Sequence, residues 1–418
     1  YTIFMLLTGF SKREFFFLFL LLFSVFSGAI RKWLLLPDVV NHGLLAFQLL
    51  IPWIFCIGFY PWNQSKIYPF LFAHLSFLFV LALLPGGCGF FHSLSGFLLH
   101  GGFWTALFVF LANSNKVNWG RFYPVSLLIL CIETILAICQ YTLPPHHVIN
   151  QYANFNAIGD IALMGESARV TGTFSYVSGF GAYILFMSFQ LWIVNVQYRV
   201  NQLVVFFHEV CLAILATLNG SRAVTFAFVL ILIASRFARE RSTSGYLIYG
   251  LFSFLLFILL ILLPDFKEWI LEPIFNLTER VTTNVDSGEQ TSRFITPWKN
   301  MFFFSSENEW FGYGLGCTYQ GANEIWGISL GILKYGYFEE ELERILIEGG
   351  WFLLLLKVSF ALLFIVLSSI PKGLSSLIFL LIFGYFPLVS NTYNSFFFLW
   401  GIISLSWQYE QKNSFLHS

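Results

Sequence analysis

Residues 346–370, LIEGGWFLLLLKVSFALLFIVLSSI, decide the fold class of this chain. A helix of about 20 mostly apolar residues is long enough to cross the roughly 30 Å hydrocarbon core of a bilayer. Apolar runs of this length recur along the sequence. One such run would be an anchor, whereas many make lipid the solvent of the whole fold.

Composition agrees with this interpretation and excludes most soluble classes. Hydrophobic residues make up 57% of the 418 positions and charged residues 11%, with 53 phenylalanines. A soluble chain would carry roughly a quarter charged residues. The net charge is zero, so nothing points to nucleic acid. The six cysteines show neither metal-ligand nor disulfide spacing, and we expect no metal and no cofactor.

The sequence predicts an all-α, polytopic membrane protein of about 12 transmembrane helices, forming a single membrane domain over residues 1–418. Only helices or closed barrels satisfy backbone groups in lipid, and runs this long are helices. The expected spans are 14–30, 38–60, 68–85, 90–112, 122–142, 173–194, 202–218, 222–237, 246–264, 346–370, 374–390 and 393–408.

Lysine and arginine in short loops set the orientation of such a protein. The strongest signal is the cluster of Arg236, Arg239 and Arg241 after the eighth span. The opposite side has fewer basic residues in short connections, namely Arg31, Lys32 and Arg222. We therefore expect the cluster and both termini to be cytoplasmic.

Residues 265–345 differ from the rest of the chain in composition. This stretch holds thirteen Asp or Glu residues and six Lys or Arg residues between two very apolar blocks. It predicts one large extracytoplasmic loop between the ninth and tenth spans. A structureless loop of this length is uncommon, and its aromatic residues favour short amphipathic helices on the membrane surface.

Four arginines stand on the predicted extracytoplasmic side, each near a helix end or in the outer loop. A guanidinium group offers a rigid fork of donors suited to phosphate and stays protonated. Several of them converging would hold a lipid-linked phosphate or pyrophosphate. Each could instead form a local ion pair with a carboxylate. They are Arg169, Arg222, Arg293 and Arg344.

An acidic stretch leads into the tenth span. On a helix Glu340, Arg344 and Glu348 are four residues apart and share one face. Glu348 would lie at membrane depth, where a carboxylate needs a partner, and Arg344 is the expected one. Glu343 or Glu348 could activate a sugar hydroxyl. The stretch could equally be an acidic helix start that complements the helix dipole.

Glu133 lies inside the fifth expected span, and His208 and Glu209 lie inside the seventh. Ionisable groups inside a membrane are functional candidates by default. They could equally form a hydrogen-bonded pair that joins two helices, and the sequence does not choose between these alternatives. His146 and His147 lack a third ligand, so we expect no metal site there.

Three alternating glycines, Gly312, Gly314 and Gly316, superficially resemble a phosphate-binding loop. They follow no buried strand and open no βαβ unit, which excludes a dinucleotide site. Glycines in this arrangement are more typical of a tight turn beside a bound ligand.

Several short segments together resemble the O-antigen polymerase and O-antigen ligase superfamily of bacterial polysaccharide membrane proteins. The resemblance covers most of the chain in topology, although its motifs are short. The matching segments are Arg169 to Phe174 with Gly179 to Tyr183, Asn219 to Ala223, Ser292 and Arg293 with Trp298 and Phe311 to Gly316, Glu343 to Gly349, and Gly28 to Pro37.

The resemblance implies a glycosyltransferase-C-like helical fold in the bacterial inner (plasma) membrane, with a metal-independent active site on the extracytoplasmic face. It implies a polyprenyl pyrophosphate-linked glycan as donor, and a chain-length regulator and a flippase as partners. The residues then expected to act in catalysis are Arg169, Arg293, Glu348 and Glu343. Those expected to bind substrate are Arg222, Arg344, Gly312, Gly314, Gly316 and Trp298.

One departure from the family pattern separates the alternatives. Family ligases place a histidine followed by asparagine where the large loop returns to the membrane, but residues 209–416 contain no histidine. This favours a polymerase of lipid-linked repeat units over a ligase. A flippase or transporter of the same lipid-linked sugars is the alternative outside enzymes.

Overall fold

The computed structural model describes residues 10–34, 36–60, 68–83, 88–153, 161–196, 200–237, 310–336, 341–384 and 392–416, with Pro273 and Asn276. Among these residues the only sheet is a two-residue antiparallel pair, β1 (Leu163–Met164) and β2 (Ser167–Ala168). The all-α prediction is therefore confirmed for the described part of the chain. The expected span 246–264, and Arg293 and Trp298 in the expected loop, lie outside the described residues.

The helices follow the expected spans closely. In chain order they are α2 (Lys12–Trp33), α3 (Asp38–Ile57), α4 (Tyr68–Leu83), α5 (Phe90–Leu111), α6 (Tyr123–Thr142), α7 (Val177–Val196), α8 (Gln202–Asn219), α9 (Arg222–Phe237), α13 (Gln320–Trp326), α14 (Leu330–Tyr335), α15 (Glu341–Leu367), α16 (Lys372–Gly384) and α17 (Thr392–Leu416). Short 3₁₀ turns are η1 (Ser114–Lys116), η2 (Trp119–Phe122) and η3 (Val148–Asn150).

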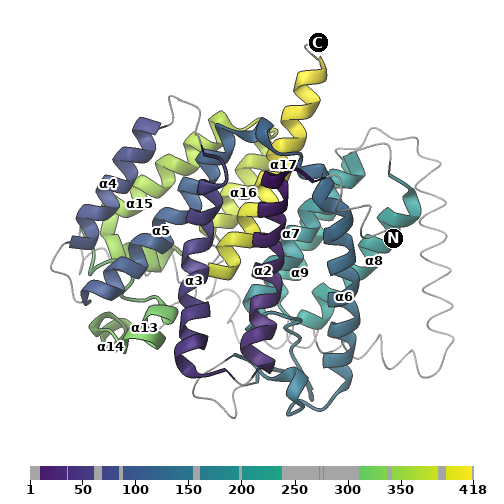
Figure 1. Cartoon of the computed structure of the whole chain (residues 1–418), viewed down its shortest axis with the longest axis horizontal. Helices are drawn as coiled ribbons and strands as arrows, with labels where there is room; N and C mark the ends of the chain where they lie inside the picture. The colour runs from purple at the N-terminus through teal and green to yellow at the C-terminus, as the bar shows by residue number, and fades with distance from the viewer. Residues whose placement is uncertain are drawn as a thin grey trace.

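Within the described residues, seven helices are long and apolar enough to cross a membrane: α2, α3, α5, α6 with η2, α7, α8 and α15. The helices α4 and α9 are apolar but shorter. A total of twelve spans stays a prediction. The start of α2 and the end of α17 lie towards the same end of the bundle, and α13 and α14 lie away from it (Figure 1).

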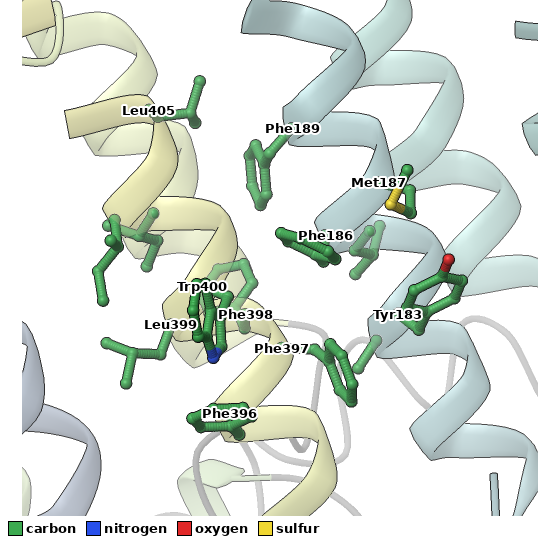
Figure 2. Packing of buried hydrophobic residues seen from close by; sticks show 14 of the residues in the cluster. Tyr183, Phe186, Met187, Phe189, Phe396, Phe397, Phe398, Leu399, Trp400 and Leu405 are labelled. Carbon is green, nitrogen blue, oxygen red and sulfur yellow. The ribbon is translucent and has the colours of Figure 1, made fainter. Parts of the chain in front are cut away.

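The core lies between α7 and α17, which are packed through aromatic side chains (Figure 2). The rings of Tyr183 and Phe397 are 5.7 Å apart, and those of Phe189 and Phe398 are 5.9 Å apart. An added Cβ at Gly401 would overlap the Phe189 ring, so this glycine lets the two helices approach closely. Because α7 is apolar on every side, it is buried at the centre of the bundle.

Outer helices carry the opposite pattern. Large apolar side chains such as Phe19, Phe72 and Val366 are more than half exposed. On a soluble protein a surface of this kind would be a liability, whereas on a membrane protein it faces lipid. The exposed and buried apolar faces therefore agree with a polytopic bundle.

Two non-helical stretches interrupt this bundle and position its polar residues. The helix α7 begins at Val177, not at residue 173 as expected, because residues 169–176 form an irregular segment. The helix α15 breaks at Gly350, whose φ is 61°. A second irregular segment, residues 310–319, passes beside this break.

Candidate functional site

The 169–176 segment is held against α6 by Gln140. The Gln140 side-chain oxygen accepts the N–H groups of Thr171, at 3.2 Å, and Gly172, at 2.8 Å. Its Nε2 donates to the Gly172 carbonyl at 3.2 Å. Gly172 has a φ of 54°, a conformation that favours glycine, and a Cβ there would overlap the Glu133 carboxylate.

Glu133 provides the second hold on this segment. Its fully buried carboxylate accepts the Thr173 N–H at 3.1 Å and the Thr173 hydroxyl at 2.5 Å. The sequence also allowed a hydrogen-bonded pair between Glu133 and His208. In the structure, His208 instead makes hydrogen bonds with Tyr123 and with the Met187 carbonyl. The Glu133 carboxylate therefore stabilises the 169–176 segment.

Two basic residues at the end of α2 also donate hydrogen bonds to the 169–176 segment. Lys32 Nζ donates to the Thr171 hydroxyl at 2.9 Å and to the Gly172 carbonyl at 2.6 Å. Arg31 Nη1 donates to the Ser175 hydroxyl at 3.2 Å. Both side chains are less than a tenth exposed. In the sequence they look like loop charges, but the structure places them inside the protein.

Arg169 contacts the end of α8, three residues before Arg222 begins α9. The half-buried Arg169 donates from Nε to the Asn219 carbonyl at 3.2 Å. Gly220, with a φ of 63°, ends α8, and Arg222 begins α9. A cation at a helix N-terminus opposes the helix dipole. Anion binding by Arg222 stays a prediction.

The 310–319 segment is attached to the break in α15. Tyr313 N–H donates to the Ile347 carbonyl at 2.6 Å and Gly314 N–H to the Glu348 carbonyl at 3.2 Å. On the other side of the break, Phe352 N–H donates to the Trp310 carbonyl. A broken helix is tolerated at membrane depth only where other protein groups or water satisfy its freed carbonyls. The segment supplies these partners.

The Glu348 carboxylate is the centre of this region. It is 2% exposed and accepts the N–H groups of Gly316, at 2.7 Å, and Thr318, at 3.1 Å. It also accepts the Thr318 hydroxyl at 2.5 Å and pairs with His100 Nε2 at 2.7 Å. A carboxylate offers about four lone-pair sites, and protein donors take them all. These contacts indicate that Glu348 stabilises the 310–319 segment, and they argue against the prediction that it activates an acceptor hydroxyl.

Arg344 lies in the same region but is not the direct partner of Glu348. Its Nη2 donates to the Thr318 carbonyl at 2.9 Å, and Glu348 pairs with His100 instead. Arg344 is 5% exposed, and its buried Nε has no hydrogen-bond partner among the described residues. Such a donor requires an acceptor that the described chain does not provide. Glu343, one residue earlier on α15, is also buried.

The glycines of the 310–319 segment are required by its backbone. Gly312, Gly314 and Gly316 have φ values of 72°, 130° and 75°. A Cβ at Gly316 would overlap the His92 carbonyl on α5, and one at Gly96 would overlap the Gly316 amide nitrogen. The expectation of a tight glycine turn is confirmed, and the turn packs directly on α5.

Helix α3 has one contact near each of the two segments. Asn41, in its first turn, accepts a hydrogen bond from Arg31 beside the 169–176 segment. Leu49 packs with Leu99 and Tyr319 beside the 310–319 segment. Leu49 lies eight positions after Asn41, which is a rise of about 12 Å along the helix. The expected site residues that the structure describes therefore form two groups, one at each segment, whereas Arg293 and Trp298 lie outside the described residues.

Several residues of these groups were missed by sequence reasoning. His100 and Lys357 are buried within α5 and α15, and both lie inside expected spans. The rule that singled out Glu133, an ionisable group at membrane depth, would have found them as well. No comparable local signal marks Thr318 or Thr173, whose role depends on a distant carboxylate.

Among the described residues, no group of three or more His, Cys, Asp and Glu side chains is arranged to hold a metal ion. Of the two histidines after the fifth expected span, His147 has a local role, since its Nδ1 accepts the Ile149 N–H at 3.3 Å. No protein-family model, no curated protein and no solved structure matches this chain.

Proposed function

We propose that the chain is a polysaccharide polymerase, which joins oligosaccharide repeat units carried on polyprenyl pyrophosphate at the extracytoplasmic face of the bacterial inner membrane. One observation carries the proposal: two irregular glycine-containing segments, residues 169–176 and 310–319, are both connected to α3, and each contains or contacts an arginine that the sequence predicts to bind an anion. Irregular backbone at membrane depth is found where it is enclosed by protein or lines a cavity.

The chemistry suits guanidinium groups. An acceptor hydroxyl oxygen attacks the anomeric carbon of the growing chain, and the bond from that carbon to the pyrophosphate oxygen breaks. The lipid pyrophosphate leaves with additional negative charge. We expect Arg169 and Arg222 at one segment, and Arg344 at the other, to stabilise this charge, with Arg293 as the fourth expected donor.

The acceptor proton needs a separate group. Glu348 is occupied by four protein donors, so Glu343 is the better candidate to receive the proton. It is buried on α15 beside Arg344. Trp298 stays a candidate for stacking on a sugar ring and lies outside the described residues.

The test uses purified protein in liposomes supplied only with lipid-linked repeat units, and a gel that resolves glycan length. We expect a ladder of longer glycans, reduced about 100-fold in rate by Arg169→Ala or Arg293→Ala. Arg121→Ala is the matched control. Its side chain is 48% exposed and pairs with Glu14, near the opposite end of α2 from Arg31. A ladder unaffected by Arg169→Ala and Arg293→Ala would remove the arginines from the mechanism.

A transporter of lipid-linked sugars is the second candidate, and two observations favour it. Transporters build substrate sites from broken helices, and α15 breaks at Gly350. His74, His100 and Lys357 also place ionisable groups deep inside helices. In the same liposomes, movement of the lipid-linked unit between leaflets without any ladder would support transport. Transfer of glycan only when a different acceptor is added would support a ligase.

A further inference from the structure

Cys88 lies against the 310–319 segment. It stands two residues before α5 begins at Phe90, and its half-buried thiol donates to the Leu315 carbonyl, with 3.6 Å between sulfur and oxygen. Cys88 and Leu315 are 227 positions apart, so no spacing in the sequence indicates this contact. Only the tertiary structure brings this cysteine to the segment.

A second cysteine contacts Cys88 at the same turn. The Cys317 thiol, two positions after Leu315, is hydrogen-bonded with the Cys88 thiol. Cys317 is 0% exposed and packs with Ile347 of α15, and Cys88 packs against the same two residues. Gly331 of α14 leaves room for this arrangement, because a Cβ there would lie 2.9 Å from the Cys317 sulfur. The two thiols are therefore held in direct contact.

Both cysteines fall on the side of the membrane that the sequence predicts to be extracytoplasmic. Cys88 lies between the expected spans 68–85 and 90–112, and Cys317 lies in the expected loop 265–345. Thiols that face the bacterial periplasm are oxidised to disulfides, whereas cytoplasmic thiols stay reduced. A disulfide forms only between cysteines whose side chains point towards each other at short range, and hydrogen-bonded thiols meet this condition.

We propose that Cys88 and Cys317 form a disulfide that joins the 310–319 segment to the start of α5. The oxidant is the disulfide of an extracytoplasmic thiol–disulfide oxidoreductase. The more accessible Cys88 thiolate attacks one sulfur of that disulfide, the other sulfur leaves, and a mixed disulfide forms. The Cys317 thiolate then attacks the Cys88 sulfur, and the second oxidant sulfur leaves. Two cysteine thiols are oxidised, one disulfide is reduced, and both protons pass to the two thiols released.

The bond adds a covalent attachment to a segment that the Glu348 carboxylate also holds. Glu348 accepts the N–H groups of Gly316 and Thr318, on either side of Cys317. A cross-link limits how far the joined parts separate when they open, and a link between distant positions limits them most. The inference depends on the expected orientation of the chain and not on the proposed polymerase activity.

The experiment looks for the linked peptide in the unmodified chain. The chain is expressed in bacterial cells with an oxidising periplasm, the cells are quenched in acid, and the membranes are dissolved in denaturant containing a maleimide. The protein is then digested without a reducing agent. Mass spectrometry should find a peptide pair joined through Cys88 and Cys317, which dithiothreitol separates. Denaturation exposes Cys317, which is fully buried in the folded protein, to the alkylating reagent.

A second pair of neighbouring cysteines serves as the internal control. Cys131 of α6 and Cys211 of α8 interact electrostatically, and both lie inside expected spans, away from an aqueous oxidant. The Cys211 thiol is hydrogen-bonded with Thr134. We therefore expect the maleimide on both Cys131 and Cys211.

Matched variants test whether the bond restrains the segment. Cys88→Ser removes the bond, whereas Cys139→Ser changes an exposed thiol of α6 and should leave it intact. Hydrogen exchange of residues 310–319 should be about tenfold faster in Cys88→Ser than in the unmodified chain or in Cys139→Ser. Residues 169–176, which contain no cysteine, should exchange equally in all three. Dithiothreitol should reproduce the change in the unmodified chain and have no effect on Cys88→Ser.

Maleimide on both Cys88 and Cys317 of the unmodified chain would overturn the proposal. So would a linked peptide that appears only after glutathione disulfide is added to the membranes, because the cell would then not form the bond. Equal exchange of residues 310–319 before and after reduction would overturn the restraining role of the bond. If Cys88→Ser does not fold, the peptide analysis and the reduction by dithiothreitol still test the proposal in the unmodified chain.

Discussion

The 169–176 and 310–319 segments are built on the same local contact. In each, a buried glutamate accepts a threonine N–H at 3.1 Å and the same threonine's hydroxyl at 2.5 Å. Each threonine follows closely after a glycine of positive φ, Gly172 or Gly316. A threonine–glutamate pair is therefore a repeated means of fixing irregular backbone inside this membrane bundle.

The two segments differ in the groups around that pair. At the 169–176 segment, Lys32 donates hydrogen bonds and Gln140 accepts two backbone N–H groups. Glu348 instead depends on His100, whose other ring nitrogen is unpaired among the described residues. The same contact is therefore supported by a lysine in one segment and by a histidine in the other.

The largest effects should come from removing the glycines. Gly172→Ala and Gly316→Ala each place a Cβ at positive φ and into overlap with Glu133 or the His92 carbonyl. We expect each to lower the free energy of unfolding by at least about 3 kcal/mol. The measurement is the fraction of monodisperse protein that survives heating in detergent. Gly373→Ala is the control, since nothing lies within 4 Å of its added Cβ; a similar loss in that variant would contradict the comparison.

Replacing either glutamate should loosen one segment and leave the other unchanged. Glu133→Gln and Glu348→Gln each leave buried donors unsatisfied, and we expect each to lower the free energy of unfolding by about 2 kcal/mol. Hydrogen exchange should rise in residues 169–176 for Glu133→Gln and in residues 310–319 for Glu348→Gln. A rise confined to the other segment would contradict the comparison.

Removing the lysine should affect one segment alone. Lys32→Met deletes donors to the Thr171 hydroxyl and the Gly172 carbonyl, although Gln140 still donates to that carbonyl. We expect a loss of about 1 to 2 kcal/mol. Hydrogen exchange should rise in residues 169–176 and not in residues 310–319. Lys12→Met, at the exposed first residue of α2, is the control and should change the free energy by less than about 0.5 kcal/mol.

The smallest effect concerns the Cys317 thiol beside Glu348 in the reduced protein. Its hydrogen bond with Cys88 and its burial raise its pKa in the folded protein above the ordinary value of 9.0. The unfolded chain then releases this proton first, so the thiol's contribution to stability is present below about pH 9 and is lost as the pH rises further. Unfolding measured on both sides of that pH should show a fall that Cys317→Ala reduces, and an unchanged fall would contradict it.

The helices and the expected site residues follow from local sequence. Apolar runs define the spans because each helix satisfies its own backbone groups and needs only an apolar surface to enter lipid. Gly172 and Gly316 are recognisable for a similar reason, since a positive φ restricts the residue at that single position. Arg344 and Glu348 stand out because charge is costly next to an apolar span.

The pairing of these residues was decided only by tertiary structure. His100 and Glu348 are 248 positions apart, and Lys32 and Gly172 are 140 apart. An apolar run determines that a helix crosses the membrane, but not which neighbour it packs against or which of its faces is turned inward. The sequence therefore determined which charged groups the membrane must accommodate. The packing of α2, α5, α6 and α15 determined their partners, because a buried charge can be satisfied only by whatever donor or acceptor the assembled bundle places within hydrogen-bonding distance.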